Sequence, residues 1–191
     1  MPRAGLTPQA VTEAGARTAD ELGYGRLSMG VVAERLGVRT PSLYAYVGGL
    51  ADLAHRVAVL ATTELGDAIR DATQGRAGPD ALAAAAGALR HWVTDHPGRY
   101  AATLEARPAG PDDPLTAAND RLLRAFEAVL YGYRLRPEDQ VHALRLVRSA
   151  LHGFVSLEGA GGFRYETDVS DSFTWLVTAL DQGLRSTASQ P

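Results

Sequence analysis

The stretch LSMGVVAERLGVRTPSLYAYVGGLADL, residues 27–53, decides the fold predicted for this chain of 191 residues. Ser28 is a helix-capping residue type before a run with apolar positions on one face, and Gly37 is a residue type that ends helices. Thr40 and Pro41 then mark a second helix start, because Thr accepts a hydrogen bond from an unpaired amide and Pro loses none in the first turn. Only a turn fits between these signals, so the stretch predicts two short helices joined tightly.

The second of these helices is predicted to run to the glycine pair at residues 48 and 49. Leu43 and Val47 are four residues apart and therefore face inward, which leaves polar and aromatic side chains on the outer side. This layout is typical of a helix-turn-helix, which places its second helix in the major groove of DNA. The predicted DNA-binding residues are Arg26, Ser28, Arg39, Thr40, Pro41, Ser42, Tyr44, Ala45, Tyr46 and Gly49.

The same residues carry a resemblance to a known family. The pattern A-x-x-L-G-V followed by L-Y is formed by Ala33, Leu36, Gly37, Val38, Leu43 and Tyr44. With it, the chain resembles the N-terminal domain of the tetracycline-repressor-like (TetR) regulators. The resemblance implies an all-α protein of about nine helices, with a three-helix DNA-binding domain (residues 1–49) and a helical ligand-binding and dimerisation domain (residues 50–191).

The chain departs from the family pattern at two positions. Family members often carry a Lys that meets a phosphate where this chain has Leu50, and a His where it has Tyr46. The amides at the start of the following helix can still bind a phosphate, because they are unpaired donors at the positive end of a helix dipole. The Tyr46 hydroxyl can also donate to a phosphate, so these contacts are weakened rather than lost.

Composition limits the classes of protein that the chain can form. It has no cysteine, which excludes a disulfide framework and a thiolate metal site, and no apolar run of the roughly 20 residues that a membrane span needs. We therefore expect a soluble, cytoplasmic protein. The net charge is −3, divided as six Arg against five acidic residues in residues 1–60 and thirteen against seventeen in the remainder. The sign of this asymmetry suits DNA binding, but its size is that of ordinary surface charge.

Caps and apolar periodicity predict helices along the rest of the chain. Their expected ranges are 7–23, 50–73, 80–95, 97–105, 115–133, 137–158 and 169–185. The last two carry wide apolar stripes. In a monomer such stripes pack inward, and in the TetR family they form a four-helix bundle with the two-fold mate; the pattern alone allows both. One motif makes few base contacts, and two motifs placed one DNA turn apart read a palindromic operator. DNA binding therefore favours a homodimer formed through these two helices.

The C-terminal part contains the ingredients of an apolar ligand pocket, although each residue also suits an ordinary core. The predicted ligand-binding residues are Trp92, Tyr100, Leu104, Phe126, Leu130, His152, Phe154 and Trp175. The segment of residues 149–163 resembles the His-Gly segment of one TetR subgroup, in which the place of the aromatic residue is here either held by Leu151 or absent. Gly153 within this helix indicates close helix packing or a ligand, packing being favoured.

No catalytic, metal or cofactor residues are predicted. His91 and His96 are five residues apart and so do not share a helical face, and no nucleophile-elbow or HExxH pattern occurs. The predicted function is a repressor, not an enzyme, that binds double-stranded operator DNA and leaves it when a small hydrophobic molecule binds. The alternatives are a DNA-binding regulator without a ligand, and a helical binding protein or enzyme.

Overall fold

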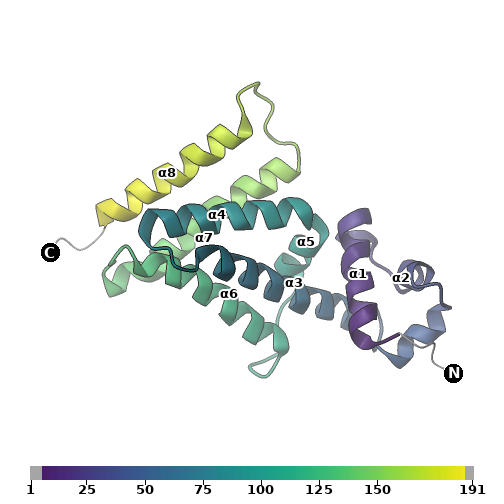
Figure 1. Ribbon diagram of the computed structural model, residues 1–191. Coiled ribbons are helices and arrows are strands. Elements are labelled where there is room, and N and C mark those ends of the chain that lie inside the picture. The colour runs from purple at the N-terminus through teal and green to yellow at the C-terminus, as the bar shows by residue number, and fades with distance from the viewer. Residues whose placement is uncertain (1–5, 188–191) are drawn as a thin grey trace. The chain divides into compact units, whose positions relative to one another are not determined.

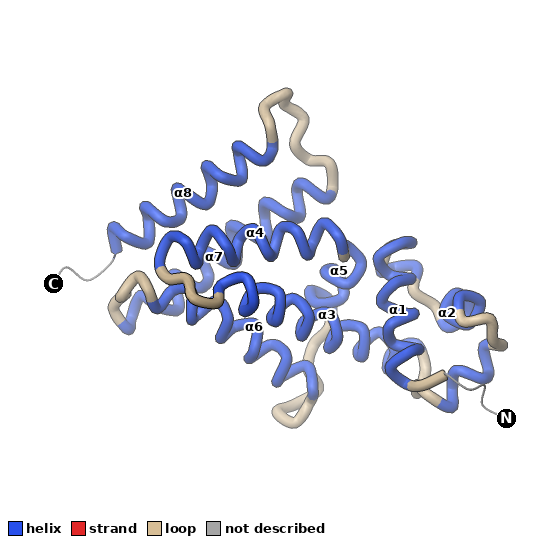
Figure 2. Tube along the Cα trace, viewed as in Figure 1, coloured by secondary structure: helices blue, strands red, loops and turns tan. Residues whose placement is uncertain are grey.

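The computed structural model of the chain describes residues 6–187, and in this part the regular elements are helices joined by loops (Figures 1 and 2). In chain order they are α1 (Pro8–Leu22), η1 (Tyr24–Arg26), α2 (Met29–Arg35), η2 (Thr40–Ala45), α3 (Leu50–Thr73), α4 (Gly78–Asp95), α5 (Pro97–Glu105), α6 (Pro114–Tyr131), α7 (Pro137–Gly159) and α8 (Val169–Thr187), where η denotes a short 3-10 helix. The all-α prediction is confirmed.

Local capping explains where the first helices begin and end. The Thr7 hydroxyl accepts a hydrogen bond from the Ala10 amide at 3.1 Å, and the Ser28 hydroxyl accepts one from the Val31 amide at 3.3 Å. Gly37 follows α2 with a φ of +64°, a left-handed conformation that glycine adopts without strain. These are the start and stop signals predicted from the sequence.

The second helix of the motif differs from its prediction. Arg39, not Thr40, flanks its start, no side-chain hydrogen bond caps it, and it ends at Ala45 as a 3-10 helix. The bonds from the Ser42 amide to the Arg39 carbonyl and from the Tyr46 amide to the Leu43 carbonyl, both 2.9 Å, span three residues. The physical reason is length: the segment has six residues, and segments this short often tighten into 3-10 geometry.

The chain divides into two compact units. The first comprises the described part of Met1–Glu64 together with Asp95–Asp120. Its core joins α1, α2, η2 and the start of α3 through side chains without solvent exposure, among them Val11, Val32, Leu43 and Leu53. The predicted division after residue 49 concerns where the DNA-binding part ends, and it stays a prediction.

The second unit comprises Leu65–Thr94 and the described part of Arg121–Pro191. It is built from the end of α3, α4, most of α6, and the pair α7 and α8, which are joined by the loop of residues 160–168 (Figure 1). Its larger buried side chains include Ile69, Leu82, Phe126, Val129, Val147, Leu151, Leu180 and Leu184. Among residues 6–187, no helix is long and apolar enough to cross a membrane, and no group of three His, Cys, Asp or Glu side chains is arranged to hold a metal ion.

Candidate DNA-binding surface and C-terminal cleft

The segment η2 presents an exposed polar and aromatic face on a buried apolar support. Leu43 and Val47 are 0% and 3% exposed, which confirms that they face inward. Tyr44 is 58% exposed. The remaining predicted contact residues of this segment are exposed (Arg39, Pro41, Ser42, Ala45) or half-buried (Thr40, Tyr46). The geometry is therefore that of a segment anchored by two buried side chains, with its outer side chains exposed to solvent.

The other predicted DNA-binding residues lie beside this segment in the chain. Arg26 is exposed at the end of η1, whereas Ser28 is half-buried and its hydroxyl caps α2. Gly49 has a φ of +130°, and a Cβ there would lie 4.0 Å from Cε1 of the Tyr44 ring. The φ value makes glycine suitable for the turn into α3, whereas the tyrosine ring lies at an ordinary contact distance and does not require it.

A carboxylate that the sequence reasoning missed lies at the start of α3. Asp52 Oδ2 accepts a hydrogen bond from the Gly48 amide at 2.8 Å, and Arg56 Nε donates to Asp52 Oδ1 at 2.9 Å. The Gly48 amide, and after it Arg56, hold the pKa of Asp52 below its usual value. A phosphate at the amides near Gly49 would therefore meet this carboxylate, with Arg56 beside it to offset the charge. An acidic residue in the first turn of α3 was the available signal.

The predicted ligand-binding residues are distributed over both units. Tyr100 and Leu104 belong to the first unit and the other six to the second. Trp92, Tyr100, Phe126 and Leu130 are buried, His152 and Phe154 are half-buried, and Leu104 and Trp175 are exposed at 43% and 74%. Their role in ligand binding stays a prediction.

Phe154 lies in an aromatic cluster that packs against the guanidinium of Arg90. Its ring centroid is 4.8 Å from that of Phe163 and 5.0 Å from that of Phe173. The Arg90 guanidinium lies 4.8 Å from the Phe173 centroid and donates from Nε to Glu158 at 2.9 Å. These contacts join α4, α7 and α8, so the position of Phe154 is explained by packing within the second unit.

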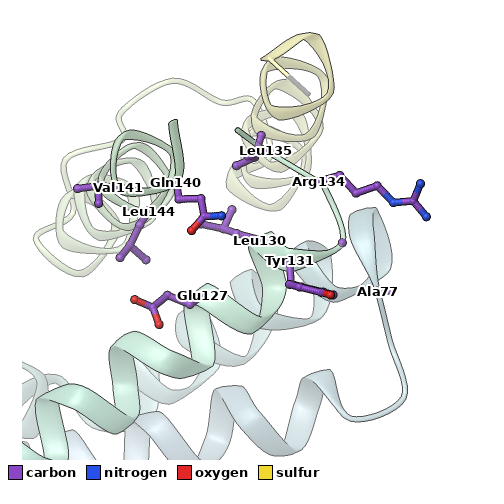
Figure 3. A pocket seen from close by; sticks show the side chains of 10 residues that line it. Ala77, Glu127, Leu130, Tyr131, Arg134, Leu135, Gln140, Val141 and Leu144 are labelled. Atoms are coloured by element: carbon purple, nitrogen blue, oxygen red, sulfur yellow. The ribbon is translucent and has the colours of Figure 1, made fainter. Parts of the chain in front are cut away.

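A cleft of about 880 Å³ opens at the corner between α6 and α7 (Figure 3). It is lined by Ala77, Glu127, Leu130, Tyr131, Gly132, Arg134, Leu135, Gln140, Val141 and Leu144. Leucine and valine side chains form its apolar part, and a carboxylate, a guanidinium and an amide lie around it. This volume falls in the range of small-molecule sites, roughly 300–1,000 Å³.

Of the predicted ligand-binding residues, Leu130 lines this cleft. The other lining residues were missed because none of them carries a signal for ligand binding when considered alone; Val141 and Leu144, for example, belong to the apolar stripe of the helix predicted at residues 137–158. The available signal was their position on either side of the short connection between two predicted helices. One wall is held by backbone packing, since a Cβ on Gly132 would lie 2.4 Å from the amide nitrogen of Gly78.

Comparison with known proteins identifies the family. Residues 82–180 match the family described as Tetracyclin repressor-like, C-terminal domain. Over 180 residues the chain is 35% identical to the HTH-type transcriptional regulator Rv0681 of Mycobacterium tuberculosis, covering 94% of this chain and 82% of that protein. The chain belongs to the TetR family. The resemblance stated from its sequence is thereby confirmed.

Further similarities agree with this assignment to the TetR family. The chain is 30% identical to the HTH-type transcriptional regulator YobS of Bacillus subtilis, over 96% of this chain and 95% of that protein. A crystal structure of a TetR variant from Acinetobacter baumannii AYE in complex with minocycline shares the fold, with a TM-score of 0.72, 22% identity and coverage of 97% and 99%. The chain is thus a DNA-binding transcriptional regulator of the TetR type and not an enzyme.

Proposed function

We propose that this chain is a homodimeric repressor that binds a palindromic operator and is released from it by a small, largely hydrophobic molecule. The observation that carries the DNA-binding part is the exposed face of η2 on the buried support of Leu43 and Val47. A major groove admits such a segment, and side chains on its outer face then meet base edges.

The contacts divide into base readers and phosphate contacts. Thr40, Ser42 and Tyr44 read base edges or thymine methyl groups. Arg39 or Arg26, with the amides near Gly49, fixes the phosphate backbone; Tyr46 adds a hydroxyl donor. The presence of Asp52 beside those amides makes the arginines the more important phosphate contacts, because a carboxylate repels a phosphate.

The outer faces of α7 and α8 support dimerisation. The inner part of each apolar stripe is buried, as at Val147 and Leu180, but Leu146, Leu157 and Trp175 are 50%, 53% and 74% exposed. The expectation of close packing at Gly153 is not met within the described chain, since a Cβ there meets nothing within 4 Å. A glycine that weakens a helix without a packing reason in the monomer fits a partner helix that approaches on this face. The two stripes thus serve both as core and as dimer interface.

The corner cleft supports ligand binding in the second unit. Leu130, Leu135 and Leu144 offer an apolar surface, and Glu127 and Arg134 offer charges of both signs at its edge. The TetR variant from Acinetobacter baumannii, which shares this fold, is in complex with minocycline in its crystal structure. A ligand with an apolar body and a polar or charged group matches the lining. Its binding would favour a state in which the two reading segments no longer match the operator.

The proposal is tested first by selecting bound duplexes from a random DNA pool with the purified full chain. Recovery of a palindrome, salt-dependent binding to it, and weaker binding by Arg39→Ala are expected. A pool without enrichment would refute the DNA-binding part. A thermal shift screen of small molecules then tests release: a compound that stabilises the protein should lower its affinity for the selected duplex. A screen in which no compound does both would favour a regulator that acts without a ligand.

A further inference from the structure

The end of α1 lies against the start of α5 with no space for a side chain between them. A Cβ atom on Gly98 would lie 1.9 Å from the carbonyl oxygen of Ala19 and 2.6 Å from the amide nitrogen of Asp20. Both neighbours are backbone atoms, which cannot move aside as a side chain can. The contact therefore requires glycine at position 98, and any substitution there separates α1 from α5.

Polar contacts reinforce this approach. Asp20 Oδ1 accepts a hydrogen bond from the Arg99 backbone amide at 2.8 Å, and Asp20 Oδ2 lies 2.9 Å from Arg99 Nε. Arg99 Nη1 also donates to Glu64 Oε2 in α3 at 2.9 Å. The side chains of Asp20 and Arg99 are only 13% and 14% exposed, so this pair is screened far less than a surface ion pair. We call Asp20, Glu64, Gly98 and Arg99 the clasp.

The clasp connects with the DNA-binding surface through α1. Val11 of α1 belongs to the same buried cluster as Val32 of α2 and Leu43 of η2, and α2 contacts both α1 and η2, so η2 is held to α1 through α2 and their shared core. At its other end α1 is held by the clasp to α5. The clasp therefore fixes η2 to α5 within the first unit, and α5 is the helix that follows α4 in the chain after a single residue, His96.

We propose that Gly98 and Arg99 are positioning residues for DNA recognition, and that the clasp sets the half-site spacing that the dimer accepts. This role rests on the proposed function, because spacing matters only to a dimer on a palindrome. Two reading segments bind together only when they lie about one helical turn of DNA apart. A loosened clasp leaves each segment intact but lets it adopt other orientations, so that discrimination between spacings falls.

The experiment compares wild type with Gly98→Ala and Arg99→Ala on three probes. These are the selected palindromic duplex, the same duplex with one central base pair inserted, and a duplex with a single half-site. We expect the affinity of wild type for the selected duplex to exceed its affinity for the duplex with the insertion by about tenfold. In both variants this ratio should fall below about threefold. Binding to the single half-site should remain within about twofold of wild type, because the contacts of each segment are unchanged.

Matched controls are available in the second unit. Gly87→Ala adds a methyl group where a Cβ meets nothing within 4 Å, and Arg70→Ala removes an exposed guanidinium paired with Asp67 and Asp71. Neither should change spacing discrimination. Asp20→Asn is a milder variant that keeps an acceptor for the Arg99 amide, and it serves if the stronger variants do not fold.

Three outcomes would overturn the proposed role of the clasp. One is folded variants that keep the wild-type spacing preference, and another is an equal loss of affinity for the half-site and the palindrome, which indicates general damage. The third outcome comes from a measurement that does not need DNA. The Gly23 amide donates a hydrogen bond to the Ala19 carbonyl at 2.9 Å, and we expect its hydrogen exchange to accelerate in Gly98→Ala and Arg99→Ala. Unchanged exchange would overturn the role even if no operator were found, whereas absence of any bound DNA refutes only the proposed function.

Discussion

Two adjacent residues of η2 are expected to respond in opposite ways to truncation to alanine. Leu43 is 0% exposed and belongs to the core that joins η2 to α1. Leu43→Ala removes buried methyl groups and leaves a cavity, which costs about 3 kcal/mol of unfolding free energy in comparable cores. Tyr44 is 58% exposed, so Tyr44→Ala should change the unfolding free energy by only about 0.5 kcal/mol. The order reverses for DNA, since loss of a base contact costs about 1–3 kcal/mol of binding free energy.

Both quantities can be measured on the same preparations. Urea denaturation followed by circular dichroism gives the unfolding free energies, and fluorescence anisotropy with the selected duplex at fixed salt gives the affinities. Tyr44→Ala should weaken binding by roughly 5–150-fold while it stays as stable as wild type. If Leu43→Ala were as stable as wild type, or Tyr44→Ala bound the duplex normally, the assignment of inner and outer faces of η2 would be wrong.

Three further changes have defined expected outcomes. Gly132→Ala should lower the unfolding free energy by about 1–3 kcal/mol, because its Cβ would lie 2.4 Å from the amide nitrogen of Gly78. Asp113→Asn should lower the thermal midpoint at neutral pH. Hydrogen bonds from the Ala109 and Leu115 amides, and to a smaller extent from His55, hold the pKa of Asp113 below its usual value. The stability that the Asp113 carboxylate contributes is therefore present above the unfolded pKa, about 3.9, and is lost as the pH falls through the folded pKa. Trp175→Glu should convert the dimer to monomer in light scattering, since it replaces an exposed apolar side chain of α8 with a charge.

Each of these changes has a matched comparison. Gly87→Ala, in an open helical position, should raise the unfolding free energy by about 0.5–1 kcal/mol, so equal effects at positions 87 and 132 would contradict the backbone contact. Tyr165→Glu alters a residue that is 93% exposed in the loop before α8 and should leave the dimer intact. For Asp113→Asn, an acid unfolding profile identical to that of wild type would refute the ionic contribution.

Much of the fold was predictable because its signals are local. Thr7 and Ser28 cap the helices they were expected to cap, and the predicted range of residues 97–105 coincides with α5. Capping, glycine stops and apolar periodicity depend on residues within about one helical turn, which a sequence displays directly. Thr40 was the exception, because so short a segment can tighten into a 3-10 helix, and a capping signal does not reveal that choice.

The amino-acid sequence by itself determined the class of this protein: helical segments in order, an apolar side of η2 at Leu43 and Val47, and a motif that resembles the TetR family, to which the chain belongs. Only the tertiary structure decided which distant residues meet. Asp20 and Arg99 are 79 residues apart along the chain, yet they form the centre of the clasp. The α6–α7 cleft is lined by residues that, taken one at a time in the sequence, give no sign of a binding site. The physical reason is that contacts across such separations depend on how helices pack, and that packing is set jointly by side chains from many elements.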